Sequence, residues 1–324
     1  MNIKSPYDAL RPIMEKYGAN GDPEGFYWAV NLAYHSVESR SYEILHSDMY
    51  AGLSLIWERL LKAIPNQDGK FRILDIGAGT GLVGTLFDRI AHERVLEMTL
   101  LDPCPDMIER AKSNSREWRF PCRFVVGRPG MPTGELYDLV TMNSVLHHIP
   151  DLPGVCKAVK SYIRPSGYLI TAQDPRWGYD HDSLFKIRAA KACCPRFNPL
   201  IRIMRSLRGM ARYFLKGKYV SPLAAETSRR LIERGIIDKP MEADIIWSIT
   251  DFHVPRQPFD IGRGINIVDL ALWLGQQRPL AYFTYQYFGI PYKDLTCEYK
   301  IKEAELFHSG DLHGELFASV WKID

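Results

Sequence analysis

A short glycine-rich run constrains the fold of this chain more than any other feature of its sequence. Residues 72–84 read RILDIGAGTGLVG: an apolar stretch ends near Asp75, and a helical pattern follows over about 81–91. The turn between them carries four small residues, Gly77, Ala78, Gly79 and Gly81. Glycine lets the backbone turn sharply and lets a ligand lie against bare main chain near a helix N-terminus. The run therefore predicts a strand, a ligand-holding turn and a helix.

Strand and helix patterns alternate through the segment that contains this turn. The expected strands are 72–76, 97–101, 122–126, 137–142 and 167–173, and the expected helices are about 81–91, 105–113 and 152–163. Such alternation indicates a parallel sheet with helices on both faces. Two further β-rich runs, 280–290 and 314–323, are expected to return to the sheet as a closing hairpin.

The remaining segments are mainly helical, and they divide the chain into four regions. We expect a helical N-terminal region over 1–65 that covers the site, and a core over 66–176. A mainly helical cap is inserted at 177–278, and C-terminal strands over 279–324 complete the sheet. The predicted fold class is α/β: a Rossmann-like, doubly wound seven-stranded sheet with a helical N-terminal region and a helical cap insertion.

The composition is that of an ordinary globular chain. Of its 324 residues, 46% are hydrophobic and 24% are charged, which is enough apolar material for a large core and argues against disorder. The first residues lack a leader pattern, and no apolar run reaches the roughly 18 residues of a membrane span. The six cysteines contain no C-x-x-C pair. We therefore expect a cytoplasmic protein with reduced thiols and no transmembrane segment.

Positive charge is concentrated in one segment, although the whole chain carries only +3. Residues 183–225 hold ten cations and no acid, and one face of a helix predicted there carries Arg202, Arg205, Arg208 and Arg212. This face is solvated, binds a carboxylate- or phosphate-bearing substrate, or contacts a membrane surface. Because the charge is local, we expect no specific nucleic-acid partner.

Two acids narrow the choice of ligand for the turn. The strand LEMTLL ends at Asp102, where an acid accepts hydrogen bonds from ribose hydroxyls in nucleotide sites. Asp75 precedes the glycines, where it would repel a pyrophosphate and attract a positive group. S-adenosylmethionine joins an adenosine to a sulfonium and an ammonium, so it suits both acids. Residues 79–84 also fit G-x-G-x-x-G, which keeps a nicotinamide-dependent oxidoreductase as an alternative.

Four motifs resemble those of one enzyme family. LDIGAGTG, LLDPCPDMIERA, YDLVTMNSVLHHIPD and IRPSGYLITAQDP resemble the first, second, fourth and fifth motifs of the class I S-adenosylmethionine-dependent methyltransferases. The resemblance is to small-molecule, ubiquinone-biosynthesis-like members; it is strong over about 70–175 and weak over 280–324. It implies a methyltransferase with S-adenosyl-L-methionine as co-substrate.

The resemblance also implies which residues hold this co-substrate. The glycines approach it closely, Asp102 binds its ribose, and Asn143 and Ser144 lie at its methionine end. Where the family often has an acid that reads the adenine, this chain has Gly127 and Arg128. The full expected set is Asp75, Gly77, Ala78, Gly79, Gly81, Asp102, Pro103, Gly127, Arg128, Asn143 and Ser144.

Two neighbouring histidines are the candidate catalytic residues. His147 and His148 follow the fourth strand, beside the expected position of the methyl group. Histidine titrates near neutrality, so either residue is suited to accept a proton from a methyl acceptor. A packing or hydrogen-bonding role is the alternative for both.

The N-terminal region carries a second pattern. Residues spaced by four predict one helical face that closes over the site, with His35 beside it: Tyr34, Glu38, Tyr42, His46 and Tyr50. His35, Glu38 and His46 also have a spacing at which one helix could present ligands to a metal. An amphipathic helix explains the pattern more simply, so we expect no metal.

The predicted activity is methyl transfer to an oxygen, carbon or nitrogen of a small metabolite, with an acidic acceptor favoured by the basic segment. A protein that binds S-adenosylmethionine without turnover is a further alternative. The identity of the acceptor stays open, and a homodimer is compatible with the sequence.

Overall fold

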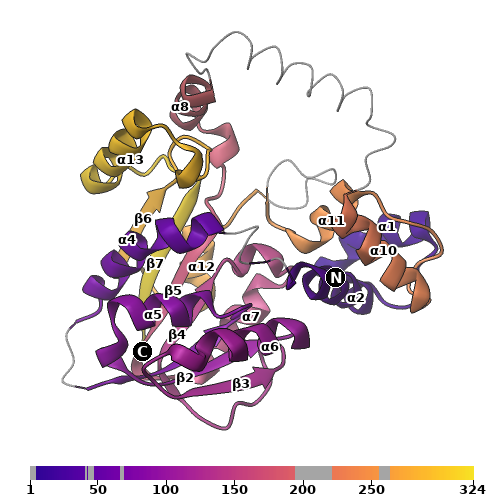
Figure 1. The fold of residues 1–324 in the computed structure, drawn as a ribbon, viewed down its shortest axis with the longest axis horizontal. Helices are drawn as coiled ribbons and strands as arrows, with labels where there is room; N and C mark the ends of the chain where they lie inside the picture. Colours follow the sequence, from indigo (N-terminus) through magenta and orange to yellow (C-terminus); the bar gives the residue numbers. More distant parts are fainter. Residues whose placement is uncertain (1–4, 41, 43–46, 66–68, 194–220, 255–262) are drawn as a thin grey trace.

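A seven-stranded sheet forms the centre of the computed structural model, which describes residues 5–40, 42, 47–65, 69–193, 221–254 and 263–324 (Figure 1). The strands are β1 (Phe71–Ile76), β2 (Val95–Asp102), β3 (Cys122–Val126), β4 (Tyr137–Asn143), β5 (Ile163–Pro175), β6 (Ala281–Tyr285) and β7 (Leu316–Ile323). Their order across the sheet is β3-β2-β1-β4-β5-β7-β6. The first five run parallel, and β7 is antiparallel to both of its neighbours. This sheet confirms the predicted Rossmann-like α/β class.

The last two strands return to the sheet and pair antiparallel to each other as predicted, but a helix and not a short hairpin turn connects them. β6 ends at Tyr285 because Gln286 has a φ of 61°, in the left-handed region, so the run over 280–290 is interrupted. Helix α13 (Cys297–Ser309) then separates the two strands, and β7 lies between β5 and β6. A β-rich composition does not reveal this return through a helix.

Helices cover both faces of the sheet. One face carries α4 (Ser47–Ala63), α5 (Leu82–Ile90) and α6 (Pro105–Asn114), and the other carries α7 (Leu152–Tyr162) and α12 (Ile267–Leu274). None of the helices in the described ranges has the length and apolar content that a membrane crossing requires.

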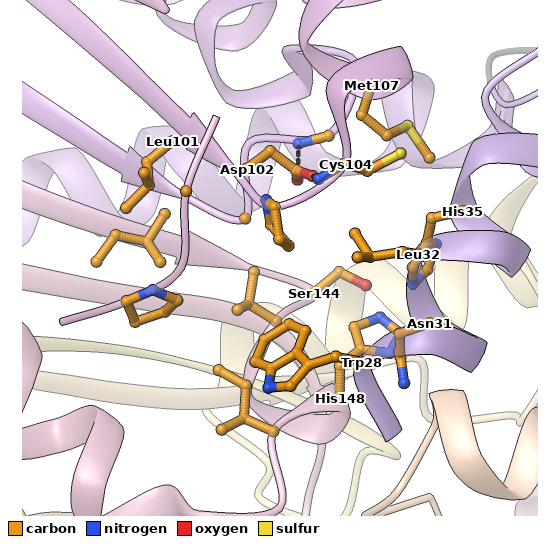
Figure 2. A pocket seen from close by; sticks show the side chains of 18 of the residues that line it. Trp28, Asn31, Leu32, His35, Leu101, Asp102, Cys104, Met107, Ser144 and His148 are labelled. Atoms are coloured by element: carbon orange, nitrogen blue, oxygen red, sulfur yellow. Dashed lines mark hydrogen bonds between the residues drawn. The ribbon is translucent and has the colours of Figure 1, made fainter. Parts of the chain in front are cut away.

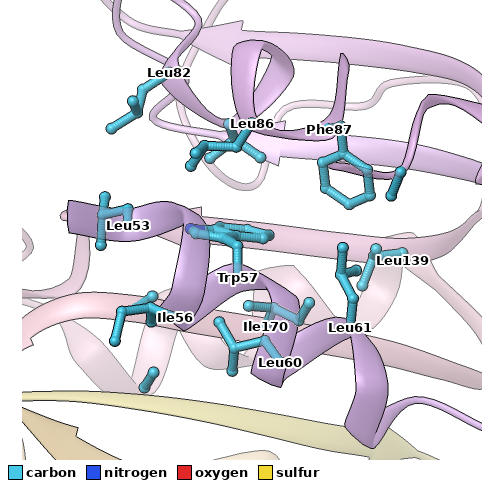
Figure 3. Close-up of a cluster of buried hydrophobic side chains, with 14 of the residues drawn as sticks. Leu53, Ile56, Trp57, Leu60, Leu61, Leu82, Leu86, Phe87, Leu139 and Ile170 are labelled. Atoms are coloured by element: carbon cyan, nitrogen blue, oxygen red, sulfur yellow. The ribbon is translucent and has the colours of Figure 1, made fainter. Parts of the chain in front are cut away.

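Helix α4 belongs to the core of the sheet, although it lies in the predicted N-terminal region. Figure 3 shows Trp57 of α4 among Leu86 and Phe87 of α5 and Ile170 of β5. The indole of Trp57 is fully buried, and its ring lies 5.7 Å from that of Phe87. Loss of a buried aromatic side chain typically costs about 3–5 kcal/mol. We infer that α4 is needed for the stability of the sheet and is not a mobile cover.

The other N-terminal helices join part of the predicted cap in one helical lobe. The lobe comprises a 3-10 helix (Pro6–Leu10), α1 (Arg11–Tyr17), α2 (Pro23–Glu38), α10 (Pro222–Glu233) and α11 (Ala243–Thr250). These helices share a hydrophobic cluster that contains the fully buried Leu10, Val30, Leu231 and Ile246. Segments about 200 residues apart in sequence therefore form one body, which lies beside the sheet in Figure 1.

The single helical face predicted from Tyr34 to Tyr50 is wrong. Helix α2 ends at Glu38, where the backbone N–H of Ser39 closes the last turn on the carbonyl oxygen of His35. A turn at Ser39 and Arg40 follows, and α4 begins separately at Ser47. His46 lies outside the described residues, as do Arg202, Arg205, Arg208 and Arg212 of the basic segment.

Candidate functional site

A cavity opens at the carboxyl ends of β1, β2 and β4, where the helical lobe meets the sheet (Figure 2). The sheet side of this first cavity is lined by residues of four loops, among them Gly77, Gly79, Asp102, Pro103, Gly127 and Ser144. Helix α2 closes the opposite side with Trp28, Asn31, Leu32 and His35. Ligands of open α/β sheets bind at this edge, so the position of the cavity agrees with that of a cofactor site.

The glycine loop forms a cradle of bare backbone. The amides of Gly77 and Ala78 both donate to the carbonyl oxygen of Leu101, at 2.8 and 3.1 Å, which ties the loop to the end of β2. Gly77 has a φ of 66°, and a Cβ there would lie 2.6 Å from the Val145 side chain. A Cβ on Gly79 would meet no atom within 4 Å and would take up space beside the cavity. The loop thus fits a ligand that lies directly on the main chain.

Asp102 presents a carboxylate to the first cavity. Its two oxygens accept hydrogen bonds from the amides of Gly79, at 2.9 Å, and Cys104, at 2.8 Å. Burial raises the pKa of this carboxyl, and the two amide bonds oppose the rise. A carboxylate has about four lone-pair directions, so acceptor capacity remains for a pair of ribose hydroxyls. The residues of the cavity therefore fit the adenosine of S-adenosylmethionine.

Five of the eleven expected cofactor residues do not line the cavity, and two of these, Asp75 and Asn143, are held inside the sheet region. The strand register places Asp75 beside Thr141, whose hydroxyl donates to Asp75 Oδ1 at 2.7 Å. The second oxygen, Oδ2, is buried without a hydrogen-bond partner in the described structure, and burial raises the pKa of Asp75 to about 7. The amide oxygen of Asn143 accepts from Trp57 Nε1 at 3.2 Å. Both side chains are thus held by the interior of the sheet region.

The other three expected residues that do not line the cavity are Ala78, Gly81 and Arg128. Ala78 and Gly81 belong to the glycine loop but are not among the lining residues, and Gly81 caps α5 beside Trp118. The guanidinium of Arg128 lies 4.0 Å from the ring centre of Trp28, a cation–π contact between the β3 loop and α2. Gly127 lines the cavity next to it, so the loop after β3 does reach the site.

Sequence analysis missed the contribution of α2 apart from His35. Trp28, Asn31, Leu32 and His35 follow the spacing i, i+3, i+4 and i+7, which is one face of a helix. The sequence carries this spacing, but the spacing by four from Tyr34 onward predicts a different helical face. Tyr42 is the one member of the predicted face that lines the cavity in the described ranges.

The two candidate catalytic histidines have different environments. His147 is buried, and its Nδ1 lies 2.8 Å from a carboxylate oxygen of Asp174. Burial alone would lower the pKa of His147, but the bond to Asp174 and its charge raise it. His147 is not among the residues that line the cavity, whereas His148 is.

The surroundings of His148 favour its neutral form, although Asp251 Oδ1 lies 3.3 Å from its Nδ1. Burial lowers its pKa well below the ordinary value, and the neighbouring His147 and His35 lower it further. Its Nδ1 lies 2.7 Å from the carbonyl oxygen of Thr250, which can only accept, so Nδ1 carries the hydrogen. The lone pair of the neutral ring is therefore on Nε2. The rings of His147 and His148 are 4.0 Å apart, and that of His35 is 5.4 Å from His148.

Charged partners surround this group of histidines. His35 Nδ1 lies 3.1 Å from Glu38, which raises the pKa of His35 against the opposing effect of burial. His147, His148 and Asp251 offer ligand atoms within 4.8 Å of one another, close enough for one cation. The Nδ1 atoms of His147 and His148 already have hydrogen-bond partners from the protein.

Replacing Asp75 by Asn should remove part of the pH dependence of stability. Because the pKa of Asp75 is raised from 3.8 to about 7, the folded protein binds the additional proton between these values. The free energy of unfolding therefore falls as pH rises through this window, by up to about 1.4 kcal/mol per pH unit. Urea unfolding from pH 4.5 to 8 measures the free energy of unfolding of both proteins. The value for Asp75→Asn minus that for the wild type should rise with pH until about pH 7 and then stay constant.

The matched control is Glu117→Gln, which changes an exposed carboxyl. Its free energy of unfolding should change with pH in parallel with that of the wild type. A parallel curve for Asp75→Asn as well would contradict the raised pKa.

Comparison with known proteins identifies the family. Residues 45–212, more than half of the chain, match the family described as a methyltransferase domain. A ubiquinone biosynthesis O-methyltransferase of Proteus mirabilis is 27% identical over 107 residues, 32% of this chain and 42% of that protein. A probable polyketide synthase of Dictyostelium discoideum is 29% identical over 154 residues, 42% of this chain and 6% of that protein. The chain thus spans less than half the length of these curated relatives.

Solved structures are also similar to the chain. A SAM-dependent methyltransferase from Leishmania major has a TM-score of 0.41 at 18% identity, over 52% of this chain and 70% of that chain. A complex of DhpI with S-adenosylhomocysteine has a TM-score of 0.37 at 17% identity, over 46% of this chain and 69% of that chain. The family match decides against the nicotinamide alternative: the chain belongs to the class I S-adenosylmethionine-dependent methyltransferases, with S-adenosylmethionine as co-substrate.

Proposed function

We propose that the protein transfers the methyl group of S-adenosylmethionine to an oxygen, carbon or nitrogen of a small metabolite, in the cytoplasm. The observation that carries this proposal is the cradle formed by Gly77, Gly79 and Asp102 beneath helix α2. The name of the ubiquinone biosynthesis relatives supports a small acceptor and favours oxygen as the methylated atom.

The protein has three tasks in such a reaction, because the sulfonium of the co-substrate supplies a methyl group that is already activated. It must hold the adenosine, bring the acceptor in line with the methyl group, and exclude water. Asp102 and the loop amides suit the first task. Trp28 and Leu32 of α2 cover the cavity and suit the third.

His148 is the proposed general base. It lines the first cavity, and the bond of its Nδ1 to the Thr250 carbonyl leaves Nε2 as the acceptor. A base needs a free lone pair at the working pH, which the lowered pKa ensures. The low pKa also means that the proton is passed on readily to water or to a neighbour. His147, held by Asp174 and in tilted ring contact with His148, is the proposed positioning residue.

Asp102→Ala tests the co-substrate site. The substitution should weaken binding of S-adenosylhomocysteine by roughly 1–3 kcal/mol, because ribose hydroxyls lose their acceptor. Calorimetric titration measures this, and Glu109→Ala on the exposed face of α6 is the control. Equal affinities for the wild type and Asp102→Ala would mean that the nucleoside binds elsewhere.

His148→Ala tests the base. Turnover, followed as release of S-adenosylhomocysteine, should fall ~100-fold or more, while the affinity for S-adenosylhomocysteine should stay within a few-fold. Because the pKa of His148 lies well below 6.5, wild-type turnover should persist when the pH is lowered to 6. The exposed His181→Ala is the control. Small, equal effects of both variants would assign His148 to packing.

The basic segment favours an acceptor that carries a carboxylate or phosphate. Its arginines lie outside the described residues, so this part of the proposal rests on sequence alone. Replacing Arg202, Arg205, Arg208 and Arg212 singly by Gln should raise KM for the acceptor in at least one variant. Moderate salt should likewise raise KM for the acceptor of the wild type. If all four variants match the wild type, the face is solvated; loss of binding to anionic vesicles would indicate a membrane contact instead.

A further inference from the structure

A second cavity lies at the carboxyl ends of β5 and β6, between α4 and α13. It encloses about 180 Å³, and its lining includes Leu53, Ile56, Gln173, Tyr285, Glu303 and Phe307. The apolar residues come from α4, from α13 and from the segment between β6 and α13, and Gln173 and Glu303 stand on β5 and α13. An apolar cavity with a few convergent polar groups is typical of a small-molecule site.

The second cavity adjoins the first across a single step of the sheet. Ser144 lines the first cavity, and its amide donates to the carbonyl oxygen of Ala172 at 2.8 Å. The next residue along β5, Gln173, lines the second cavity. The residue after it, Asp174, holds His147. Since neighbouring strands lie about 4.8 Å apart, lining residues of the two cavities are neighbours at this edge of the sheet.

Backbone strain marks the same edge. Gln173 and Gln286 have φ values of 64° and 61°, a conformation that non-glycine residues rarely adopt, and both line the second cavity. Ser144, with a φ of 61°, lines the first. Such strain persists where surrounding contacts impose it, and it clusters at ligand sites.

Specific hydrogen bonds impose the strained positions. The amide of Gln173 donates to the hydroxyl oxygen of Tyr285 at 2.7 Å, and that hydroxyl donates to Gln173 Oε1 at 3.0 Å. The amide of Gln286 donates to Glu303 Oε1 at 2.6 Å. One of the two lone pairs of the Gln173 amide oxygen is thus used by Tyr285, while its Nε2 donors have no partner among the described residues.

The charge of the lining selects against anions. Glu303 is buried, and its carboxyl also accepts from the amide of Tyr287. Burial raises its pKa to about 7, against the effect of these amide bonds. No Lys or Arg is among the lining residues in the described part of the chain. Arg188 acts on this carboxyl, but it is bound by Asp311 and does not line the cavity, so the carboxylate repels a second negative charge there.

We infer that the second cavity holds the uncharged, ring-bearing part of the methyl acceptor, with a hydroxyl group that accepts from the Gln173 amide and donates to Glu303. This inference rests on the proposed function, because it places the acceptor beside the co-substrate. An acidic group on the acceptor would then lie outside this cavity.

A titration with 2-naphthol, a neutral hydroxylated ring, tests the inference on the full chain saturated with S-adenosylhomocysteine. Wild-type protein should bind 2-naphthol and should bind 2-naphthoate at least tenfold more weakly at pH 8. Ala304→Phe fills the cavity from α13 and should weaken the binding of 2-naphthol at least tenfold. The control Ile301→Phe adds the same side chain at an exposed position of that helix and should leave this binding unchanged. Binding by Ala304→Phe equal to that of the wild type, or no wild-type binding, would overturn the inference.

A second pair of variants keeps the test independent of packing. Glu303→Gln should narrow the preference for 2-naphthol over 2-naphthoate, while Glu305→Gln, at an exposed position two residues along α13, should leave it unchanged. An unchanged preference in Glu303→Gln would contradict the role of this carboxyl. Binding of S-adenosylhomocysteine is measured first in every variant. If the wild type does not bind S-adenosylhomocysteine, the proposed function is refuted. If it binds S-adenosylhomocysteine but not 2-naphthol, only the second site is refuted.

Discussion

The carbonyl oxygen of Leu101 holds the site together, because it accepts hydrogen bonds from both Gly77 and Ala78. These bonds bend the chain back over the end of β2 immediately after β1, and they bring the amide of Gly79 to Asp102. The loop has no room for a side chain at Gly77, where a Cβ would meet Val145 from the β4 loop. The ends of three adjacent strands thus fix the cradle, and the helical lobe needs only to cover it.

The sequence was sufficient for those parts of the structure that depend on local patterns. The glycine turn and the strand ending at Asp102 are signalled by neighbouring residues, and both occur as predicted. The hairpin and the lobe depend on distant pairings: β7 inserts between β5 and β6, and α2 packs against α10 and α11. Periodicity within one segment shows that a helix has an apolar face but does not identify the segment that covers it.

Asp75 and the two histidines show the same limit at the level of single side chains. The sequence predicts that Asp75 attracts a cation. The register of β1 and β4 instead sets it beside Thr141, where burial raises the pKa of its carboxyl and so disfavours the charged form. His147 and His148 are adjacent in sequence, yet Asp174 raises the pKa of one and burial lowers that of the other. Their partners lie 27 and 102 residues away, at Asp174 and Thr250, so sequence alone could not separate their roles.

Helix α4 links the two cavities to the stability of the core. Trp57 donates to Asn143 at the end of β4, while Leu53, about one turn earlier, and the adjacent Ile56 line the second cavity. The same helix therefore fixes the strand end from which Ser144 enters the first cavity. Because α4 packs on the sheet through fully buried side chains, movement of this wall would cost core packing. The helical lobe has its own hydrophobic cluster, and hydrogen bonds join it to the sheet side, among them those of Tyr27 and Thr250 with His148. Opening on the α2 side would have to break these hydrogen bonds, whereas movement of α4 would also disrupt the core.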